Sequence, residues 1–271
     1  MRIERIPLSE TKEDVYLDAY VADRIGSYKR GALLVIPGGA YWAVCSDREG
    51  EPIAHAFMPH GYNCFVLHYS VARTGQFPCQ LIEATRAIKH IKDHAEEYGI
   101  DPERLFVVGF SAGGHLAAST GVLWKLPEVY ESVPMPYGYN KPRGVMLIYP
   151  VISPRLEHHF SSFTHLWCSD EPTEDQKARS AIDENVDSDS APAFIMHTAD
   201  DGGVDVRNVL RLANAYSDAK IAYEMHIYPN GPHGVALANE ITEAGNDYWV
   251  DERISEWVRL AAGWAKQLCE K

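Results

Sequence analysis

The chain has 271 residues, of which 46% are hydrophobic and 23% are charged, and its formal net charge is −13. This length and composition are typical of a globular protein with a sizeable core, built as one large α/β domain or two small ones. Because the negative charge repels nucleic-acid phosphates and anionic membrane surfaces, we expect neither as a partner.

Five cysteines lie far apart in the chain without CxxC spacing: Cys45, Cys64, Cys79, Cys168 and Cys269. An odd number at wide spacing predicts neither a disulfide framework nor a structural zinc site. The first residues lack the apolar stretch of a signal peptide, and no run of about 18 apolar residues could form a membrane helix. We therefore expect a cytoplasmic protein, and the sequence makes no prediction of its oligomeric state.

Short apolar runs that predict strands alternate along the chain with segments of helical periodicity. The first run, 14–22, alternates between apolar and polar residues, which is typical of an antiparallel edge strand. The later runs are mostly continuous in apolar residues, as in parallel strands covered on both faces: 32–37, 63–71, 104–110, 144–151, 193–198 and 222–229. Apolar residues recur every three or four positions in three helical segments: 80–99, 206–219 and 252–268. This alternation predicts an α/β fold with a mostly parallel central sheet flanked by helices.

Two longer segments interrupt the alternation. Residues 124–143 contain four prolines and three tyrosines, and residues 154–191 are polar and acidic. Loops of this length within a compact domain are usually functional or disordered. We expect a single domain over residues 1–271, with both segments inserted to form a small cap above the sheet.

The stretch Gly109-Phe110-Ser111-Ala112-Gly113 matches the pattern G-x-S-x-G and stands between a predicted strand and a helix rich in small residues. In a nucleophile elbow the turn is so tight that the serine adopts a strained backbone and its neighbours must be small. Gly109, Gly113 and Gly114 meet that requirement. We therefore predict that Ser111 is a nucleophile rather than an incidental serine in a glycine-rich turn.

A serine hydroxyl is a weak nucleophile at neutral pH, so it needs a histidine base that a carboxylate orients. In this kind of fold the three follow the chain order Ser, acid, His. His233 lies in the loop after the last predicted strand and is the expected base, whereas His226 lies within that strand and should pack locally. The acid should follow the preceding strand, where Asp200 and Asp201 are adjacent and loop position alone does not separate them.

Acyl transfer also needs backbone N–H groups that bind the developing oxyanion. The amide of Ala112, directly after the nucleophile, is one expected donor. Gly39 and Ala40, in the stretch "VIPGGAYW" after an early strand, are the others. Tyr41 and Trp42 follow them and are candidate substrate-binding residues, because aromatic rings can stack on a sugar or line an acyl pocket.

The remaining histidines give no metal site. His115, two residues past the elbow, is expected to be a satisfied helix residue. His158 and His159 together with Asp170 fit no known ligand spacing. We predict no metal and no other cofactor.

Taken together, these residues resemble the α/β-hydrolase superfamily, its esterase and lipase group, and most closely small bacterial acetyl-esterase and acetyl-xylan-esterase-like enzymes. The matching stretches are "PGGAYW", "DPERLFVVGFSAGGHLAA", "LIYPVIS", "APAFIMHTADDGGVDVRNVLRLANA" and "HIYPNGPHGVALA". In these relatives the acid is followed by two residues and a valine, so the resemblance implies Asp201, with Val204 in place. The implied triad is Ser111, Asp201 and His233. Pro37 stands where hormone-sensitive-lipase relatives carry histidine, which disfavours that subgroup.

We expect a serine carboxylester hydrolase that removes short acyl groups, in the first place acetyl, from a small soluble substrate such as an acetylated sugar. An amide-bond hydrolase of the same fold, peptidase or arylformamidase-like, stays open, since "PGGAYW" is similar to the HGGxW motif of formamidases. A peptidase relative would carry a large gating domain. A non-catalytic ligand-binding protein would lack a triad member, and none is missing.

Overall fold

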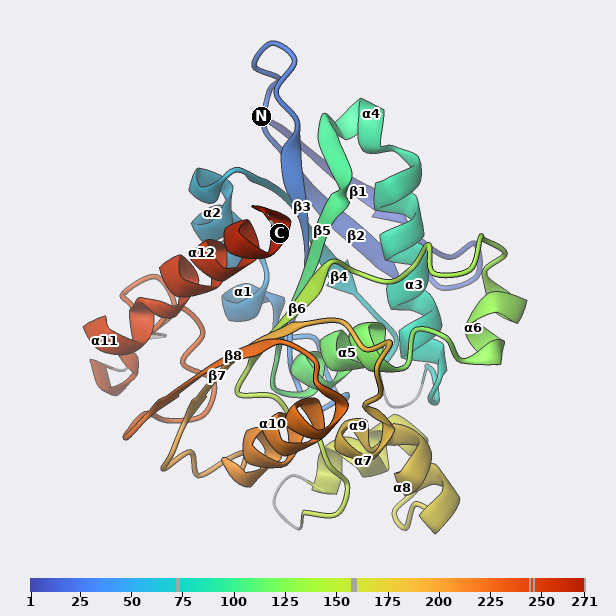
Figure 1. Cartoon of the computed structure of the whole chain (residues 1–271), viewed down its shortest axis with the longest axis vertical. Coiled ribbons are helices and arrows are strands. Elements are labelled where there is room, and N and C mark those ends of the chain that lie inside the picture. The colour runs from blue at the N-terminus through green and yellow to red at the C-terminus, as the bar shows by residue number, and fades with distance from the viewer. Residues whose placement is uncertain (72–73, 157–159, 244, 246, 271) are drawn as a thin grey trace.

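An eight-stranded sheet runs through the centre of the computed structural model, which describes residues 1–71, 74–156, 160–243, 245 and 247–270 (Figure 1). Its spatial order is β1-β2-β4-β3-β5-β6-β7-β8. The strands are β1 (Arg2–Pro7), β2 (Tyr16–Val21), β3 (Arg30–Ile36), β4 (Tyr62–His68), β5 (Ile100–Phe110), β6 (Gly144–Ile148), β7 (Ala193–Thr198) and β8 (Tyr223–Tyr228). The strands from β4 to β8 in this order pair in parallel, whereas β1 and β2 are antiparallel. The predicted mostly parallel sheet is confirmed.

The identity of the edge strand at the N-terminal side of the sheet differs from the expectation. The predicted edge strand is β2, but it lies one position inward, because β1 pairs along its outer side. Residues of β1 alternate between exposed and half-buried, and half of its side chains are charged. A strand with little apolar surface gives no hydrophobic signal, so the sequence pattern missed it.

Helices cover both faces of the sheet (Figure 1). They are α1 (Ser46–Glu49), α2 (Glu51–Phe57), α3 (Cys79–Asp93), α4 (Ala95–Tyr98), α5 (Ser111–Val122), α6 (Pro127–Ser132), α7 (Phe160–Trp167), α8 (Glu174–Ser180), α9 (Ile182–Asn185), α10 (Arg207–Ala219), α11 (Glu252–Ser255) and α12 (Trp257–Glu270). Short 3₁₀ turns lie at Met58–His60 and Asp247–Trp249. Within the described residues, no helix has the length and apolar character needed to cross a membrane.

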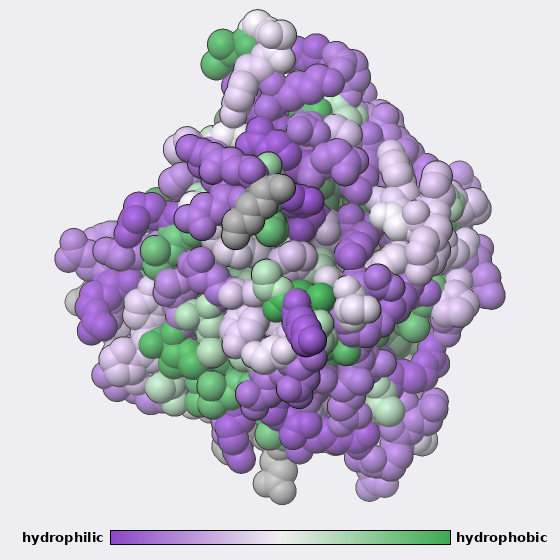
Figure 2. All heavy atoms as spheres, viewed as in Figure 1, coloured by the Kyte–Doolittle hydropathy of each residue, from purple (hydrophilic) through white to green (hydrophobic). Residues whose placement is uncertain are grey.

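Two apolar cores result, one on each face of the sheet. Helices α3, α5 and α10 pack with Leu34 and Ile36 of β3 on one face. Helices α2 and α12 pack with Leu33 and Val35 of the same strand on the other face. A strand that is covered on both faces is mostly apolar at successive positions, which is why β3 shows a continuous hydrophobic run over residues 32–36. The outer surface shown in Figure 2 is mainly hydrophilic, and its largest hydrophobic group lies over β7 and β8.

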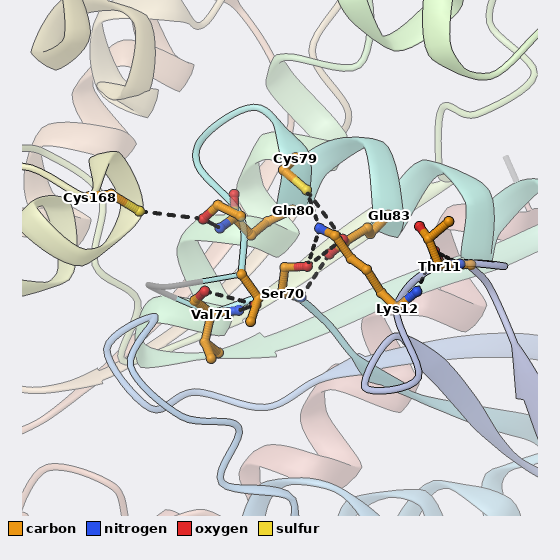
Figure 3. Close-up of polar contacts among 11 residues, drawn as sticks. Thr11, Lys12, Ser70, Val71, Cys79, Gln80, Glu83 and Cys168 are labelled. Atoms are coloured by element: carbon orange, nitrogen blue, oxygen red, sulfur yellow. Dashed lines mark hydrogen bonds and ion pairs between the residues drawn. The ribbon is translucent and has the colours of Figure 1, made fainter.

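Lys12, in the turn after β1, ties the antiparallel strands to the parallel part of the sheet (Figure 3). Its Nζ donates to Ser70 Oγ at 2.7 Å, to Cys79 Sγ at 3.1 Å and to Glu83 Oε1 at 3.1 Å. Glu83 is buried and also accepts hydrogen bonds from the backbone N–H and the hydroxyl of Ser70. The ammonium group thus compensates the one buried carboxylate on the first turns of α3, as a buried charge requires.

The two inserted segments contact each other, through the ion pairs Lys125–Asp187 and Glu128–Arg179. Residues 124–143 lead from the end of α5 to the start of β6, so both ends of this segment lie away from Ser111 and from the carboxyl ends of the parallel strands. Residues 154–191 follow β6 and carry α7, α8 and α9 (Figure 1). Of the two segments, only residues 154–191 start at the carboxyl ends of the parallel strands, where Ser111 lies. We therefore propose a cap formed by this segment alone.

Candidate active site

Ser111 stands at the junction between β5 and α5, where the chain turns abruptly from strand to helix. Its φ is 52°, a left-handed conformation that a non-glycine residue adopts only at a cost in free energy. The turn also requires a glycine at position 113, because a Cβ there would lie 2.2 Å from the Ile36 carbonyl oxygen. The strained serine and its small neighbours have the geometry expected of a nucleophile elbow.

Three residues that follow three different strands form one hydrogen-bonded chain. Ser111 Oγ lies 2.9 Å from His233 Nε2, and His233 Nδ1 lies 2.8 Å from Asp201 Oδ2. Ser111 directly follows β5, and Asp201 and His233 lie in the loops after β7 and β8; the carboxyl ends of these parallel strands lie at the same end of the sheet. This geometry allows the imidazole to take a proton from the hydroxyl while the carboxylate holds its other nitrogen.

The surroundings of Asp201 keep its carboxylate ionised and correctly aimed. Its Oδ1 accepts hydrogen bonds from the N–H groups of Gly203 at 2.7 Å and Val204 at 2.9 Å, which leaves Oδ2 for His233. Burial raises the pKa of Asp201, but the hydrogen bond and charge of His233 and the Val204 N–H outweigh it, so the pKa lies below its ordinary value. Only 1% of this side chain is exposed.

Asp200, the adjacent candidate, points elsewhere. It is exposed, and its carboxylate accepts hydrogen bonds from Asn230 Nδ2 at 2.9 Å and from the Gly231 N–H at 2.8 Å. These contacts tie the loop after β7 to the loop after β8. The choice that loop position left open is thus decided by side-chain direction, and Asp201 is the residue that reaches His233.

The loop after β3 lies directly against Ser111. A Cβ on Gly38 would come within 3.0 Å of Ser111 Cβ and 2.8 Å of the Phe110 carbonyl oxygen, so the backbone approaches as closely as a glycine permits. Gly39 and Ala40 then take positive φ values of 121° and 53°.

The backbone N–H groups of Gly39 and Ala40 make no hydrogen bond to any other described residue. Ala112 lies in the first turn of α5, where an N–H has no partner within the helix. These three N–H groups are the expected oxyanion donors, and they remain candidates on this geometry.

The expectation that Tyr41 contacts substrate is wrong. Its side chain is 1% exposed, and its hydroxyl donates to His115 Nδ1 at 2.7 Å, because the left-handed turn directs the ring into the core. His115 Nε2 in turn donates to the Ser180 carbonyl oxygen at 2.8 Å, which confirms His115 as a satisfied helix residue. Burial lowers the pKa of His115 to about 4, so the ring is neutral at pH 7.

Trp42, in contrast, is 52% exposed and lies beside the same loop. Its ring packs at a tilt on the His165 ring of α7, with 5.1 Å between the ring centroids. His165 Nδ1 donates to the Ala40 carbonyl oxygen at 2.8 Å, which joins α7 to the loop after β3. Trp42 therefore presents an aromatic surface next to the candidate oxyanion donors.

Other sequence expectations also have a place in the structure. His226 lies in β8 and hydrogen-bonds to Glu224, as expected for a locally packed residue. His158 and His159 lie outside the described residues. Among the residues that are described, no three histidine, cysteine or acidic side chains gather in a way that could hold a metal ion.

Sequence analysis missed Glu49 and Tyr149, two residues that contact the loops of the site. Glu49 is only 3% exposed, although "SDREG" has the composition of an exposed turn. Tyr149 directly follows β6 and adopts a φ of 39°. No local pattern distinguishes such residues, because their burial depends on segments about 100 positions apart in the chain.

Comparison with known proteins places the chain in a family. The model of the BD-FAE family matches residues 17–216, which include Ser111 and Asp201. The chain belongs to the BD-FAE family. The expected resemblance to esterase-type α/β-hydrolases close to acetyl-xylan esterases is confirmed. This family match supports it, and so do relatives that are named esterase and acetylxylan esterase.

Several known proteins are similar to this chain. An acetylxylan esterase of Xylanibacter ruminicola is 27% identical over 212 residues, which cover 75% of this chain and 40% of the esterase. The acetyl ester-xyloside bifunctional hydrolase of Caldicellulosiruptor lactoaceticus is 30% identical with a TM-score of 0.82, over 98% of this chain and 96% of that one. An α/β hydrolase enzyme from a Medee basin deep-sea metagenome library is 33% identical with a TM-score of 0.82, over 100% and 99%. The expected α/β-hydrolase fold is confirmed.

The chain spans 33% to 62% of the length of three curated relatives, this acetylxylan esterase among them. What those longer proteins do as wholes enters only as support for a proposal.

Proposed function

We propose that the protein is a serine carboxylester hydrolase that removes short acyl groups, acetyl first, from a small soluble substrate such as an acetylated sugar. The observation that carries this proposal is the continuous hydrogen-bonded chain from Ser111 through His233 to Asp201. The candidate donors Gly39, Ala40 and Ala112 on the same side of the sheet supply the second requirement for acyl transfer.

The proposed reaction begins with attack of Ser111 Oγ on the ester carbonyl while His233 Nε2 takes the hydroxyl proton. Asp201 holds the Nδ1–H and stabilises the imidazolium that forms. The backbone N–H groups bind the oxyanion of the tetrahedral intermediate. His233 then protonates the leaving alcohol, which departs and leaves an acyl-enzyme. Water, activated by the same imidazole, attacks the acyl group and restores Ser111 with release of the carboxylic acid.

Two features support an acetylated sugar as the substrate class. Trp42 offers a half-exposed ring beside the loop of the proposed oxyanion hole, and aromatic faces stack on the apolar faces of sugar rings. Two of the similar proteins carry the names of acetylxylan esterase and acetyl ester-xyloside hydrolase. In our proposal α7, which packs on Trp42, belongs to a small cap over the acyl pocket.

The proposal is tested by replacing Ser111 with alanine and following release of acetate from an acetyl ester and from acetylated xylo-oligosaccharides. Loss of the nucleophile should lower kcat by about a millionfold. Ser119→Ala is a matched control, because Ser119 lies on the same helix and its hydroxyl donates to the His115 carbonyl oxygen one turn earlier. Retention of near-normal hydrolysis by Ser111→Ala would overturn the proposed function.

The same catalytic groups could cleave an amide. Matched acetyl ester, peptide and aryl formamide substrates separate these possibilities, and a preference for either nitrogen leaving group would replace the esterase assignment. A ligand-binding protein without catalytic activity would leave a serine-reactive phosphonate unreacted, whereas the proposed enzyme is labelled at Ser111 only when His233 is present.

A further inference from the structure

Glu49, at the end of α1, places a carboxyl group inside the protein and next to the candidate site. Its Oε2 accepts a hydrogen bond from the Gly38 N–H at 2.7 Å, and its Oε1 accepts one from the Tyr149 hydroxyl at 2.8 Å. Burial raises the pKa of Glu49, although both hydrogen bonds and the charges of His233 and Arg48 act against the rise. Burying such a group is unfavourable unless it is hydrogen-bonded, and here each of its two oxygens accepts a hydrogen bond.

Tyr149 carries the contact onward to the loop that follows β8. Its hydroxyl accepts a hydrogen bond from the Ala236 N–H at 3.0 Å while it donates to Glu49. Its ring meets the His233 ring edge to face, with 5.1 Å between centroids. Tyr149 therefore contacts the histidine loop twice, once through the backbone of Ala236 and once through the imidazole itself.

The two ends of this network are the two loops whose relative placement acyl transfer needs. Gly38 lies against Ser111 and immediately precedes the candidate donors Gly39 and Ala40. Ala236 lies three residues after His233. Gly38, Glu49, Tyr149 and Ala236 thus form a continuous link between the oxyanion loop and the histidine loop, separate from the Ser–His–Asp chain.

We infer that Glu49 is a positioning residue of the reaction, which holds the oxyanion donors and the base in register with Ser111 through Gly38 and Tyr149. This inference rests on the proposed function. Glu49 acts through other groups, because both of its oxygens are occupied by Gly38 and Tyr149. An error of about 1 Å in the placement of reacting groups can lower a rate about 100-fold, so the loss of this link should be measurable.

The decisive variants differ in which part of the link they remove. Glu49→Leu removes both hydrogen bonds. Tyr149→Phe removes the hydroxyl, and with it the hydrogen bonds to Glu49 and from Ala236, but keeps the bond between Gly38 and Glu49. Glu49→Gln keeps an oxygen for the Gly38 N–H and an amide nitrogen that can donate to the Tyr149 oxygen. Glu51→Leu is a matched control, because Glu51 has a mostly exposed side chain and contacts His55 on its own helix.

We expect Glu49→Leu to lower kcat for an acetyl ester about 100-fold, with KM changed by no more than roughly threefold. Tyr149→Phe should fall between this variant and the native protein, and Glu49→Gln should recover most of the loss. The affinity for a boronic acid, which forms a tetrahedral adduct with Ser111, should fall by the same factor as kcat. Glu51→Leu should leave kcat, KM and boronic acid affinity unchanged.

A purely structural role predicts another result. In that case Glu49→Leu and Tyr149→Phe unfold at lower temperature but retain the native kcat and boronic acid affinity, and the inference is overturned. If Glu49→Leu does not fold, Tyr149→Phe and Glu49→Gln decide by the same two measurements. Ser111→Ala separates the two levels: if it stays active the proposed function fails, whereas if it is inactive and the Glu49 variants are native-like, only the positioning role fails.

Discussion

Replacing Asp201 with asparagine should inactivate the protein while leaving its fold intact. The asparagine oxygen is expected to keep the hydrogen bonds from the N–H groups of Gly203 and Val204. If the amide nitrogen pointed there instead, it could not accept a hydrogen bond, and both N–H groups would lose their acceptor. The amide nitrogen must then donate to His233 Nδ1, which places the imidazole hydrogen on Nε2. That nitrogen can no longer take the proton of Ser111.

The expected loss follows from this wrong tautomer. The equivalent change in a protease with the same triad lowers kcat about 10⁴-fold, which corresponds to about 5 kcal/mol in the activation free energy. Asp200→Asn is the matched control, since Asp200 bonds only to Asn230 and Gly231 among the described side chains and N–H groups and should change kcat less than roughly threefold.

The assay compares kcat for an acetyl ester in both variants, after thermal unfolding has shown that each remains folded. A large loss in Asp200→Asn, together with a small loss in Asp201→Asn, would refute the assignment of the acid. Equal small losses in both would refute the requirement for an oriented imidazole.

Three further outcomes follow from the structure. Gly203→Ala should lower kcat about tenfold or more, because the added Cβ would lie 2.6 Å from His233 Cβ. In the control Gly202→Ala, the added Cβ has no atom within 4 Å, and kcat should not change. Equal kcat values for the two variants would contradict the close approach of Gly203 to His233. Burial lowers the pKa of His115 to about 4 from 6.5, so the unfolded chain binds more protons between these values. The free energy of unfolding should therefore fall by up to about 3 kcal/mol as the pH drops through that range, and urea titrations of His115→Gln should show a smaller fall; an unchanged slope would argue against the buried neutral ring. Trp42→Ala should raise KM about tenfold for acetylated xylo-oligosaccharides but little for a small acetyl ester, and a uniform change for both would argue against sugar stacking.

Most of the candidate site residues could be predicted from the sequence, because the patterns that mark them are local. The elbow needs a strand, a serine between glycines and a helix in direct succession, and residues 104–122 contain all three. The loop with the proposed oxyanion donors and His233 likewise follow predicted strands within a few residues. The parallel order of those strands then brings the loops to one edge of the sheet, so topology alone predicts that they meet.

Other features depended on contacts between distant segments. Asp200 and Asp201 are equivalent in sequence position, and only the turn at Gly203 and Val204 directs one of them toward His233. Tyr41 and Trp42 are both aromatic and adjacent, yet the left-handed backbone at Tyr41 buries one ring and exposes the other.

The amino-acid sequence by itself determined the layered α/β fold and the positions of the proposed nucleophile and base, because hydrophobic periodicity and tight turns depend on near neighbours in the chain. The family resemblance implied Asp201 where loop position left two aspartates open, and the tertiary structure shows that its side chain reaches His233. Only the tertiary structure decided which aromatic ring faces solvent, and that Glu49 is buried between two loops. These features depend on side-chain direction and on the exclusion of water by segments that lie far apart in the chain and meet only after folding.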